Sequence, residues 1–238
     1  MMRKLLILIL LLCCGACFAA PKDVFDKADK CVVFIEAVAK VTMAMDSETE
    51  SNEEEIVATG VVTDSDGTIV TSAMVMDPTV ALQSLFGGIL GSLMKLNISY
   101  KSVKVRFPNG DRADADIVST DKDTDTAVLK VKSLPGGVVP AEKGGTLDLF
   151  DDFIVCAKAA RGDNSLAAWT CTVGAVLSKP RKMYYCKELD MGGKSTPGNP
   201  VFTLDGKLVG FVTTYINPDL TMDNIRSESM GITAVNPL

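Results

Sequence analysis

Histidine is absent from the 238 residues of this chain, and that absence excludes a large part of enzyme chemistry. Imidazole is the usual general base for a serine or cysteine nucleophile and the usual nitrogen ligand for zinc. Mechanisms that need an imidazole are therefore excluded. Aromatic residues are also scarce, at 6% of the chain. Hydrophobic residues nevertheless make up 47%, which is enough to build a buried core.

Basic residues are fewer than acidic residues in this chain. The chain has 24 Lys and Arg against 30 Asp and Glu, a formal net charge of −6. An acidic chain has no electrostatic basis for binding the phosphate backbone, so we expect no nucleic-acid partner.

The first 20 residues have the pattern of an export signal. Arg3 and Lys4 precede a short apolar run at 5–12, and small residues follow. The run is too short to span a membrane comfortably. Gly-Ala-Cys ending at Cys17 resembles a bacterial lipobox, although Cys14 stands where a leucine is usual; cleavage by an ordinary signal peptidase is the alternative. We expect residues 1–20 to be a signal peptide and the protein to be periplasmic, anchored to the cell envelope through a lipidated Cys17, or secreted.

Four cysteines lie beyond that signal, and none of them forms a Cys-x-x-Cys pair. Without that spacing and without histidine, we predict no metal site and no cofactor. An even number of cysteines in an exported chain permits disulfides, but the same residues also serve as small buried side chains. If one bridge forms, we favour Cys171–Cys186, because the two flank the turn at 177–180 and would face each other across a hairpin. The four are Cys31, Cys156, Cys171 and Cys186.

Short apolar or alternating segments separated by turn residues recur along the chain, which is typical of an all-β sandwich or barrel. The turn Pro-Gly-Gly at 135–137 predicts a boundary between an N-terminal unit, residues 21–134, and a C-terminal unit, residues 135–238. The block of like charge at 46–55 predicts a solvated loop.

One segment departs from the strand pattern. Apolar residues between Val80 and Leu96 are spaced three and four apart, as on one face of a helix. We predict a helical insertion near 80–96, within an inserted region at 78–100. The alternative is an element that touches a membrane or a partner.

Four further segments carry distinctive patterns. Residues 59–76 contain an Asp-Gly turn and end Thr-Ser-Ala-Met-Val-Met, and residues 124–130 read Thr-Asp-Thr-Ala-Val-Leu-Lys. Residues 195–210 contain Ser-Thr-Pro-Gly-Asn-Pro followed by an Asp-Gly turn, and residues 230–236 read Met-Gly-Ile-Thr-Ala-Val-Asn. In this order and spacing they resemble the protease domain of HtrA/DegP-like, trypsin-like serine proteases of the PA clan. The resemblance implies two six-stranded antiparallel β-barrels, and the PDZ domain common in that family is expected to be absent.

The resemblance also locates a catalytic triad, and the sequence departs from it. Met74 stands at the position of the base, Asp125 at that of the acid, and Pro197 at that of the nucleophile. Proline has no hydroxyl and no backbone N–H, which the family uses in its oxyanion hole. The relic of that loop comprises Ser195, Thr196, Gly198 and Asn199.

We therefore expect a non-catalytic homologue, a pseudoprotease that binds proteins or peptides or acts as a scaffold at the bacterial envelope. Two alternatives remain open at this point. One is an active serine endopeptidase with a non-standard nucleophile, Ser195. The other is a structural lipoprotein at the membrane surface, in which Cys17 and the 80–96 segment carry the function.

Overall fold

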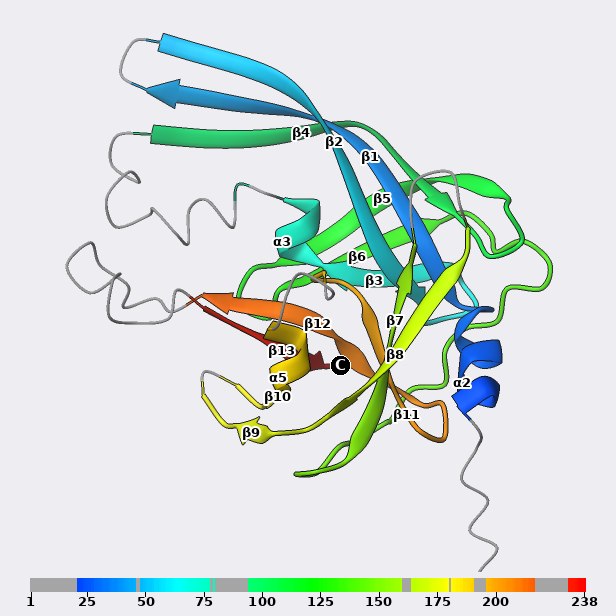
Figure 1. Cartoon of the computed structure of the whole chain (residues 1–238). Helices are drawn as coiled ribbons and strands as arrows, with labels where there is room; N and C mark the ends of the chain where they lie inside the picture. The colour runs from blue at the N-terminus through cyan, green and yellow to red at the C-terminus, as the bar shows by residue number, and fades with distance from the viewer. Residues whose placement is uncertain are drawn as a thin grey trace, which may run out of the picture.

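A computed structural model describes residues 21–45, 48–77, 79, 94–159, 164–179, 181–190, 196–216 and 231–238. Strands dominate it, in two antiparallel sheets that fall on either side of residues 132–151 (Figure 1). The predicted all-β class is confirmed. None of the helices in this part of the chain is long and apolar enough to cross a membrane.

The first sheet is a closed six-stranded barrel, as the sequence predicts, with the strand order β1-β2-β3-β6-β5-β4. It closes because β1 pairs with both β2 and β4. Ile35, Ile69 and Leu129, from three of its strands, are fully buried in its core. The strands are β1 (Val32–Met45), β2 (Glu48–Val62), β3 (Thr68–Ser72), β4 (Met94–Arg106), β5 (Arg112–Asp121) and β6 (Thr126–Val131).

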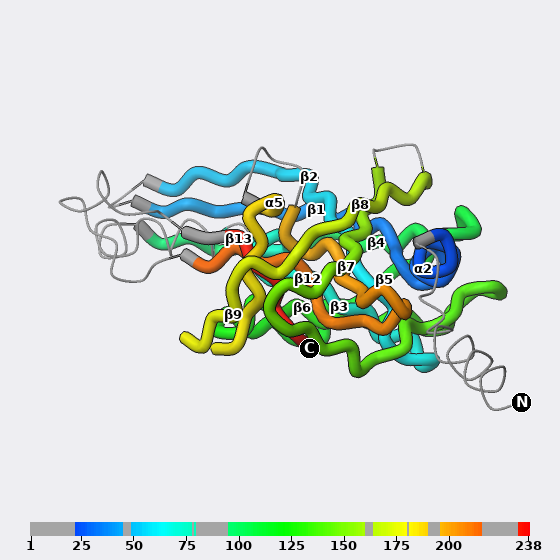
Figure 2. Tube along the Cα trace, turned by 60° about the horizontal axis from the view of Figure 1, so that its bottom comes forward, coloured from blue at the N-terminus to red at the C-terminus, as the bar shows by residue number. Residues whose placement is uncertain are grey.

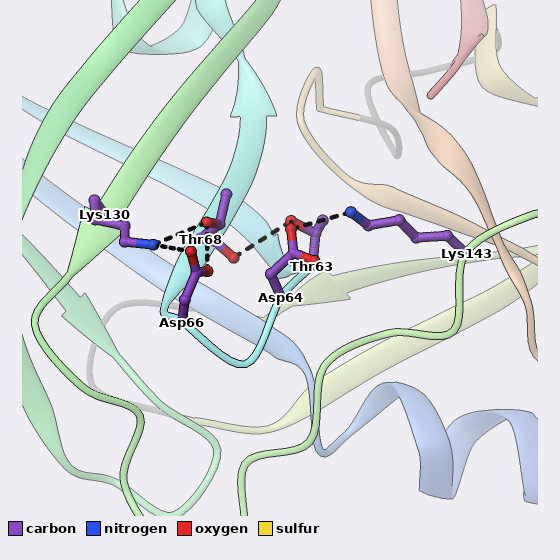
Figure 3. A network of polar contacts seen from close by, with 6 residues as sticks. All are labelled: Thr63, Asp64, Asp66, Thr68, Lys130 and Lys143. Carbon is purple, nitrogen blue, oxygen red and sulfur yellow. Dashed lines mark hydrogen bonds and ion pairs between the residues drawn. The ribbon is translucent and has the colours of Figure 1, made fainter.

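The turn between β2 and β3 is fastened on both sides by ion pairs (Figure 3). Asp66 forms an ion pair with Lys130 of β6. Asp64 forms an ion pair at 3.1 Å with Lys143, which lies in the segment that leads to the second sheet. Gly67 has φ +88°, and a Cβ there would lie 2.5 Å from a backbone oxygen of β6. Only glycine fits this close approach, so the predicted Asp-Gly turn is confirmed for a physical reason.

Beyond the barrel, β1, β2 and β4 continue as a three-stranded ribbon, at the upper left of Figure 1. The prediction of a solvated loop at 46–55 is wrong for residues 48–55, which belong to β2. The acidic run forms a strand because β1 supplies its partners. Lys40 stands opposite Glu53 in the register, and Lys101 of β4 forms an ion pair with the same Glu53.

The predicted helical insertion needs a similar correction. Met94 to Leu96 belong to β4, where they pair with the distal end of β1, so the last residues of the 80–96 segment and the end of the 78–100 region are strand. Residues 80–93 lie outside the described part of the chain.

Among the described residues, the second sheet has seven strands in the order β8-β7-β11-β12-β13-β10-β9, one more than the resemblance implies. Together with the closed first barrel, it is consistent with the predicted double-barrel fold. The extra strand arises at Gly174, where the chain leaves β8 and its N–H donates to the carbonyl of Tyr185 at 2.8 Å. β8 therefore ends at Thr172, and β9 begins at Ala175. The strands are β7 (Asp152–Lys158), β8 (Leu166–Thr172), β9 (Ala175–Leu177), β10 (Met183–Tyr185), β11 (Pro200–Thr203), β12 (Leu208–Ile216) and β13 (Gly231–Pro237).

Helix α2 (Pro21–Ala28) lies at the end of the molecule opposite the ribbon (Figures 1 and 2). Pro21 suits a first helical position, where its missing N–H costs nothing. Val24 and Ala28, one turn apart, are fully buried in the core of the first barrel. The same core takes Phe202 and Phe211 from the second sheet, so the two sheets share this core, and the second sheet has a further core cluster of its own.

Candidate functional site

Asp125 lies at the end of a tight loop that leads into β6. The Asp121 carboxylate accepts hydrogen bonds from the backbone N–H of Asp123 and of Thr124, at 2.9 and 3.2 Å, which folds the loop back on itself. Asp125 then takes φ 49°, a left-handed conformation that aspartate tolerates better than most residues. The loop thereby carries the Asp125 side chain into the interior, where the residue is 6% exposed.

Donors from both sheets converge on the Asp125 carboxylate. The hydroxyl of Ser72, the last residue of β3, lies 2.9 Å from both carboxylate oxygens. The backbone N–H of Met74 donates to Oδ1 at 2.8 Å, and the hydroxyl of Thr213, in β12, donates to Oδ2 at 2.6 Å. Asp125 therefore joins the first barrel to the second sheet through a buried, fully hydrogen-bonded carboxylate.

The charge of Asp125 is set by two opposing effects. Burial raises the pKa of the carboxyl above its ordinary value of 3.8, because the charged form loses its hydration. The hydrogen bonds from Thr213, Met74 and Ser72 act in the opposite direction but do not cancel the burial.

Met74 lies in a one-turn helix, α3 (Ala73–Met76), that follows β3. Ser72 caps this helix, because its hydroxyl accepts a hydrogen bond from the N–H of Val75 at 3.4 Å. The cap turns the backbone N–H of Met74 toward Asp125. The side chain of Met74 is half-buried and ends in a thioether, which has no titratable proton.

Pro197 lies in the loop that leads into β11, and this loop presses against the first barrel. Gly198 has φ +92°, and its N–H donates to the carbonyl of Val212 at 2.8 Å. A Cβ at Gly198 would lie 2.5 Å from the Thr71 hydroxyl and 3.3 Å from the N of Ser72. The Pro197 loop therefore meets the end of β3, next to Ser72 and α3.

Side chains of the second half of the chain also form hydrogen bonds with the backbone of the loop before Asp125. The side-chain amide of Asn236, in β13, donates to the carbonyl of Thr124 at 2.7 Å. Arg181 donates to the side-chain oxygen of Asn236 at 2.9 Å and also to the carbonyl of Asp123. The position of Asp125 thus depends on both halves of the chain.

This arrangement, a buried acid at the junction of a closed barrel and a second antiparallel sheet, agrees with a match to a known family. The profile of the trypsin-like peptidase domain matches residues 58–211, which is more than half of the chain. The chain belongs to the trypsin-like peptidase domain family. No curated protein was found to match it.

Within this trypsin-like peptidase domain, the structure brings the three positions that we predict for the triad to one place. Met74 contacts Asp125 directly, and Pro197 adjoins Gly198, which lies against Ser72. Of the relic of the oxyanion loop, Thr196 is exposed and Gly198 and Asn199 are buried, while Ser195 lies outside the described residues. The lipidation candidate Cys17 also lies outside them.

Sequence reasoning missed two residues of the trypsin-like site, Ser72 and Thr213. Ser72 had a local signal, because a serine directly before a short apolar helix is an N-cap pattern. Thr213 had none, because a threonine in a strand looks the same whether its hydroxyl faces solvent or a buried acid. The resemblance gives Asp125 as the acid of the triad, and the structure adds side-chain partners for it from both sheets.

The four cysteines in the described part of the chain are all buried, and all four are free thiols. The hairpin around the turn at 177–180 forms as predicted, from β9 and β10. The placement of Cys171 across that hairpin is wrong, because Cys171 belongs to β8, before the break at Gly174. Within the described residues, no three acidic or cysteine side chains gather in a way that could hold a metal ion.

Proposed function

We propose that this chain is a non-catalytic relative of the trypsin-like serine proteases that binds extended segments of other proteins. One observation carries the proposal. The Asp125 carboxylate accepts hydrogen bonds from the Ser72 hydroxyl, the Met74 backbone N–H and the Thr213 hydroxyl. The chain has no histidine that could take their place. In the triad mechanism the acid orients an imidazole, and the imidazole takes the proton from the attacking hydroxyl. A thioether at Met74 can do neither.

The nucleophile position supports the same proposal. Pro197 offers neither a hydroxyl to attack a carbonyl nor an N–H to stabilise the oxyanion. The loss of one oxyanion-hole donor alone typically lowers the rate by about 10²–10³-fold. Base, nucleophile and one donor would have to be replaced together for this site to hydrolyse peptides, and Asp125 is already engaged as a link between the sheets.

A binding role has a candidate surface beside Asp125, along one side of β12. β11 pairs with β12 only as far as Phe211, and the backbone of Val212 is bonded to Gly198 and Asn199 of the Pro197 loop. Because backbone groups alternate sides along an antiparallel strand, the N–H and C=O of Thr214 face the same side as those of Val212. Among the described residues, no strand pairs with that side beyond Phe211. An extended peptide could add there as a strand, held by main-chain hydrogen bonds.

We place this activity at the bacterial envelope, because residues 1–20 have the pattern of an export signal. A domain exported in this way would meet unfolded or extended protein segments without cleaving them.

The test measures binding and cleavage on one substrate. Fluorescein-labelled casein, an unfolded protein, is titrated with the purified chain and followed by fluorescence anisotropy, and the same mixtures are run on a gel after a day. We expect saturable binding and intact casein. Cleavage that disappears in Ser195→Ala would overturn the non-catalytic proposal, and the absence of saturable binding would overturn the binding proposal.

A matched pair of variants locates the binding edge. Thr214→Pro removes the N–H of Thr214, and Thr214→Val keeps it while removing only the hydroxyl. We expect Thr214→Pro to weaken casein binding by about tenfold, the size of one lost hydrogen bond, and Thr214→Val to bind like the parent chain. Thermal unfolding of both variants identifies any loss that comes from misfolding. Equal affinity for two folded variants would show that the peptide binds elsewhere.

A further inference from the structure

Two cysteines lie near the two opposite edges of the second sheet. In the strand order of that sheet, β8 is at one edge, and β10 and β9 are at the other. Cys171 is in β8, and Cys186 directly follows β10. The short helix α5 (Lys187–Asp190), which begins right after Cys186, lies against β8, so the two edges of the sheet approach each other at this point (Figure 1).

The two thiols interact at this point. The Cys171 thiol is hydrogen-bonded to the sulfur of Cys186, and the Cys186 thiol donates in turn to the carboxylate of Glu188 at 2.7 Å. The indole N–H of Trp169 is hydrogen-bonded to the sulfur of Cys171. Both cysteines belong to the apolar core of the second sheet, and they are 2% and 0% exposed. Both thiols thus lie in one buried cluster, at the place where α5 contacts β8.

The other two cysteines provide an internal comparison. Cys31 and Cys156 lie in the shared core, and burial raises the pKa of each thiol to about 12, which makes both poor nucleophiles. The thiol of Cys31 is hydrogen-bonded to the carbonyl of Ala28 at 3.4 Å. In contrast, the hydrogen bond from Cys171 lowers the pKa of Cys186, which increases the share of reactive thiolate.

We infer that Cys171 and Cys186 form a reversible disulfide that staples β8 to the β10 end of the second sheet. The oxidant is a disulfide, either that of a thiol–disulfide oxidoreductase or oxidised glutathione. The Cys186 thiol loses its proton to water, and its thiolate attacks the oxidant to form a mixed disulfide. Cys171 then displaces the second thiol. One S–S bond replaces two S–H bonds, and the oxidant takes up two electrons and two protons as two thiols. Since both cysteines are buried, the exchange takes place as the chain folds or when the β9–β10 hairpin opens locally.

The test equilibrates the purified chain with oxidised or reduced glutathione and then alkylates free thiols in denaturant. Peptide mass spectrometry identifies which cysteines are linked. After oxidation we expect a Cys171–Cys186 linked peptide, with Cys31 and Cys156 alkylated, and after reduction we expect all four to be alkylated. Alkylation of Cys171 and Cys186 in oxidised glutathione, or a Cys31–Cys156 link in place of theirs, would overturn the inference.

Two further readings come from the same samples. Trp169 is the single tryptophan of the chain, so its fluorescence, which a neighbouring disulfide quenches, reports on this region alone. The staple encloses a short loop, and we expect oxidation to raise Tm by about 5–10 °C. Cys171→Ser should abolish both changes, and the matched control Cys31→Ser should keep them. A Tm shift of the same size in Cys171→Ser would assign the stabilisation to another site and contradict the staple.

Discussion

The two sides of the Asp125 junction differ in what they have kept of a protease. The side that comes from the first barrel holds a complete hydrogen-bonded cluster, in which Ser72 and the Met74 N–H bind a buried carboxylate. The side that comes from the second sheet holds Pro197, which the resemblance predicts to stand at the nucleophile position, and its loop is packed closely on the first barrel through Gly198. Both sides keep contact between the sheets, and under the proposed function neither keeps reactivity.

This difference teaches that a triad position can serve folding independently of catalysis. The Asp125 carboxylate accepts a hydrogen bond from one hydroxyl of each sheet. Its removal would break the link to Thr213, which lies 88 residues away in the sequence. Met74 contributes its backbone N–H, which any residue except proline supplies. The hydrogen-bonded cluster therefore depends on the Asp125 carboxylate and on the fold, but not on a basic side chain at position 74.

The largest effect should come from removing the acid. Asp125→Ala leaves two hydroxyls and one N–H buried without their acceptor, and we expect the free energy of unfolding to fall by about 3–4 kcal/mol. Urea unfolding followed by circular dichroism measures it. Asp125→Asn keeps one acceptor oxygen and the volume, so its loss should be about half as large. A loss below about 1 kcal/mol for Asp125→Ala would show that the cluster does not hold the sheets together.

The next effect concerns the second-sheet side of the junction. Gly198→Ala puts a Cβ 2.5 Å from the Thr71 hydroxyl at φ +92°, and we expect a loss of about 2–3 kcal/mol from strain and displaced packing. Gly110 is the matched control, because it has φ +90° with nothing within 4 Å of an added Cβ. Gly110→Ala should cost only the conformational part, about 1 kcal/mol. Equal losses in urea unfolding would mean that the Pro197 loop does not press on the first barrel.

A smaller effect is expected from a single bond across the junction. Thr213→Val keeps the shape of the side chain and removes the hydroxyl that donates to Asp125 at 2.6 Å. We expect a loss of about 1–2 kcal/mol. In the Asp125→Ala background the same substitution should cost much less, because the acceptor is already gone. A double-mutant cycle measures this coupling, and additive losses would contradict the link.

The smallest effect is the pH dependence of the cluster. Burial raises the pKa of Asp125 in the folded protein above its ordinary value of 3.8, so the folded state binds the proton more tightly than the unfolded state. The stability from this group is full below the unfolded pKa and is lost as the pH rises through the folded pKa. Compared with Asp125→Asn, the parent chain should therefore gain stability between pH 7 and pH 4 in urea unfolding. A relative loss over that range would reverse the sign and contradict the burial argument.

The sequence predicted the fold wherever local chemistry decides it. The turn at Gly67 and the alternation of β6 predict the hairpins of the first barrel. Prediction failed where a distant partner decides. The acidic residues of β2 form a strand because β1 lies alongside, and β9 is separate from β8 because it pairs with β10, whereas β8 pairs with β7. The identities of Met74 and Pro197 could be read from the sequence, whereas the hydroxyl of Thr213 at Asp125 depends on how two sheets meet.

The central claim is that this trypsin-like domain has no working nucleophile. The most direct measurement treats the purified chain with a fluorophosphonate, which reacts covalently with activated serines, and records the intact mass, with an active serine protease as the positive control. The account predicts no mass increase in the chain and complete labelling of the control. An adduct mapped to Ser195, absent in Ser195→Ala and in the heat-unfolded chain, would contradict it.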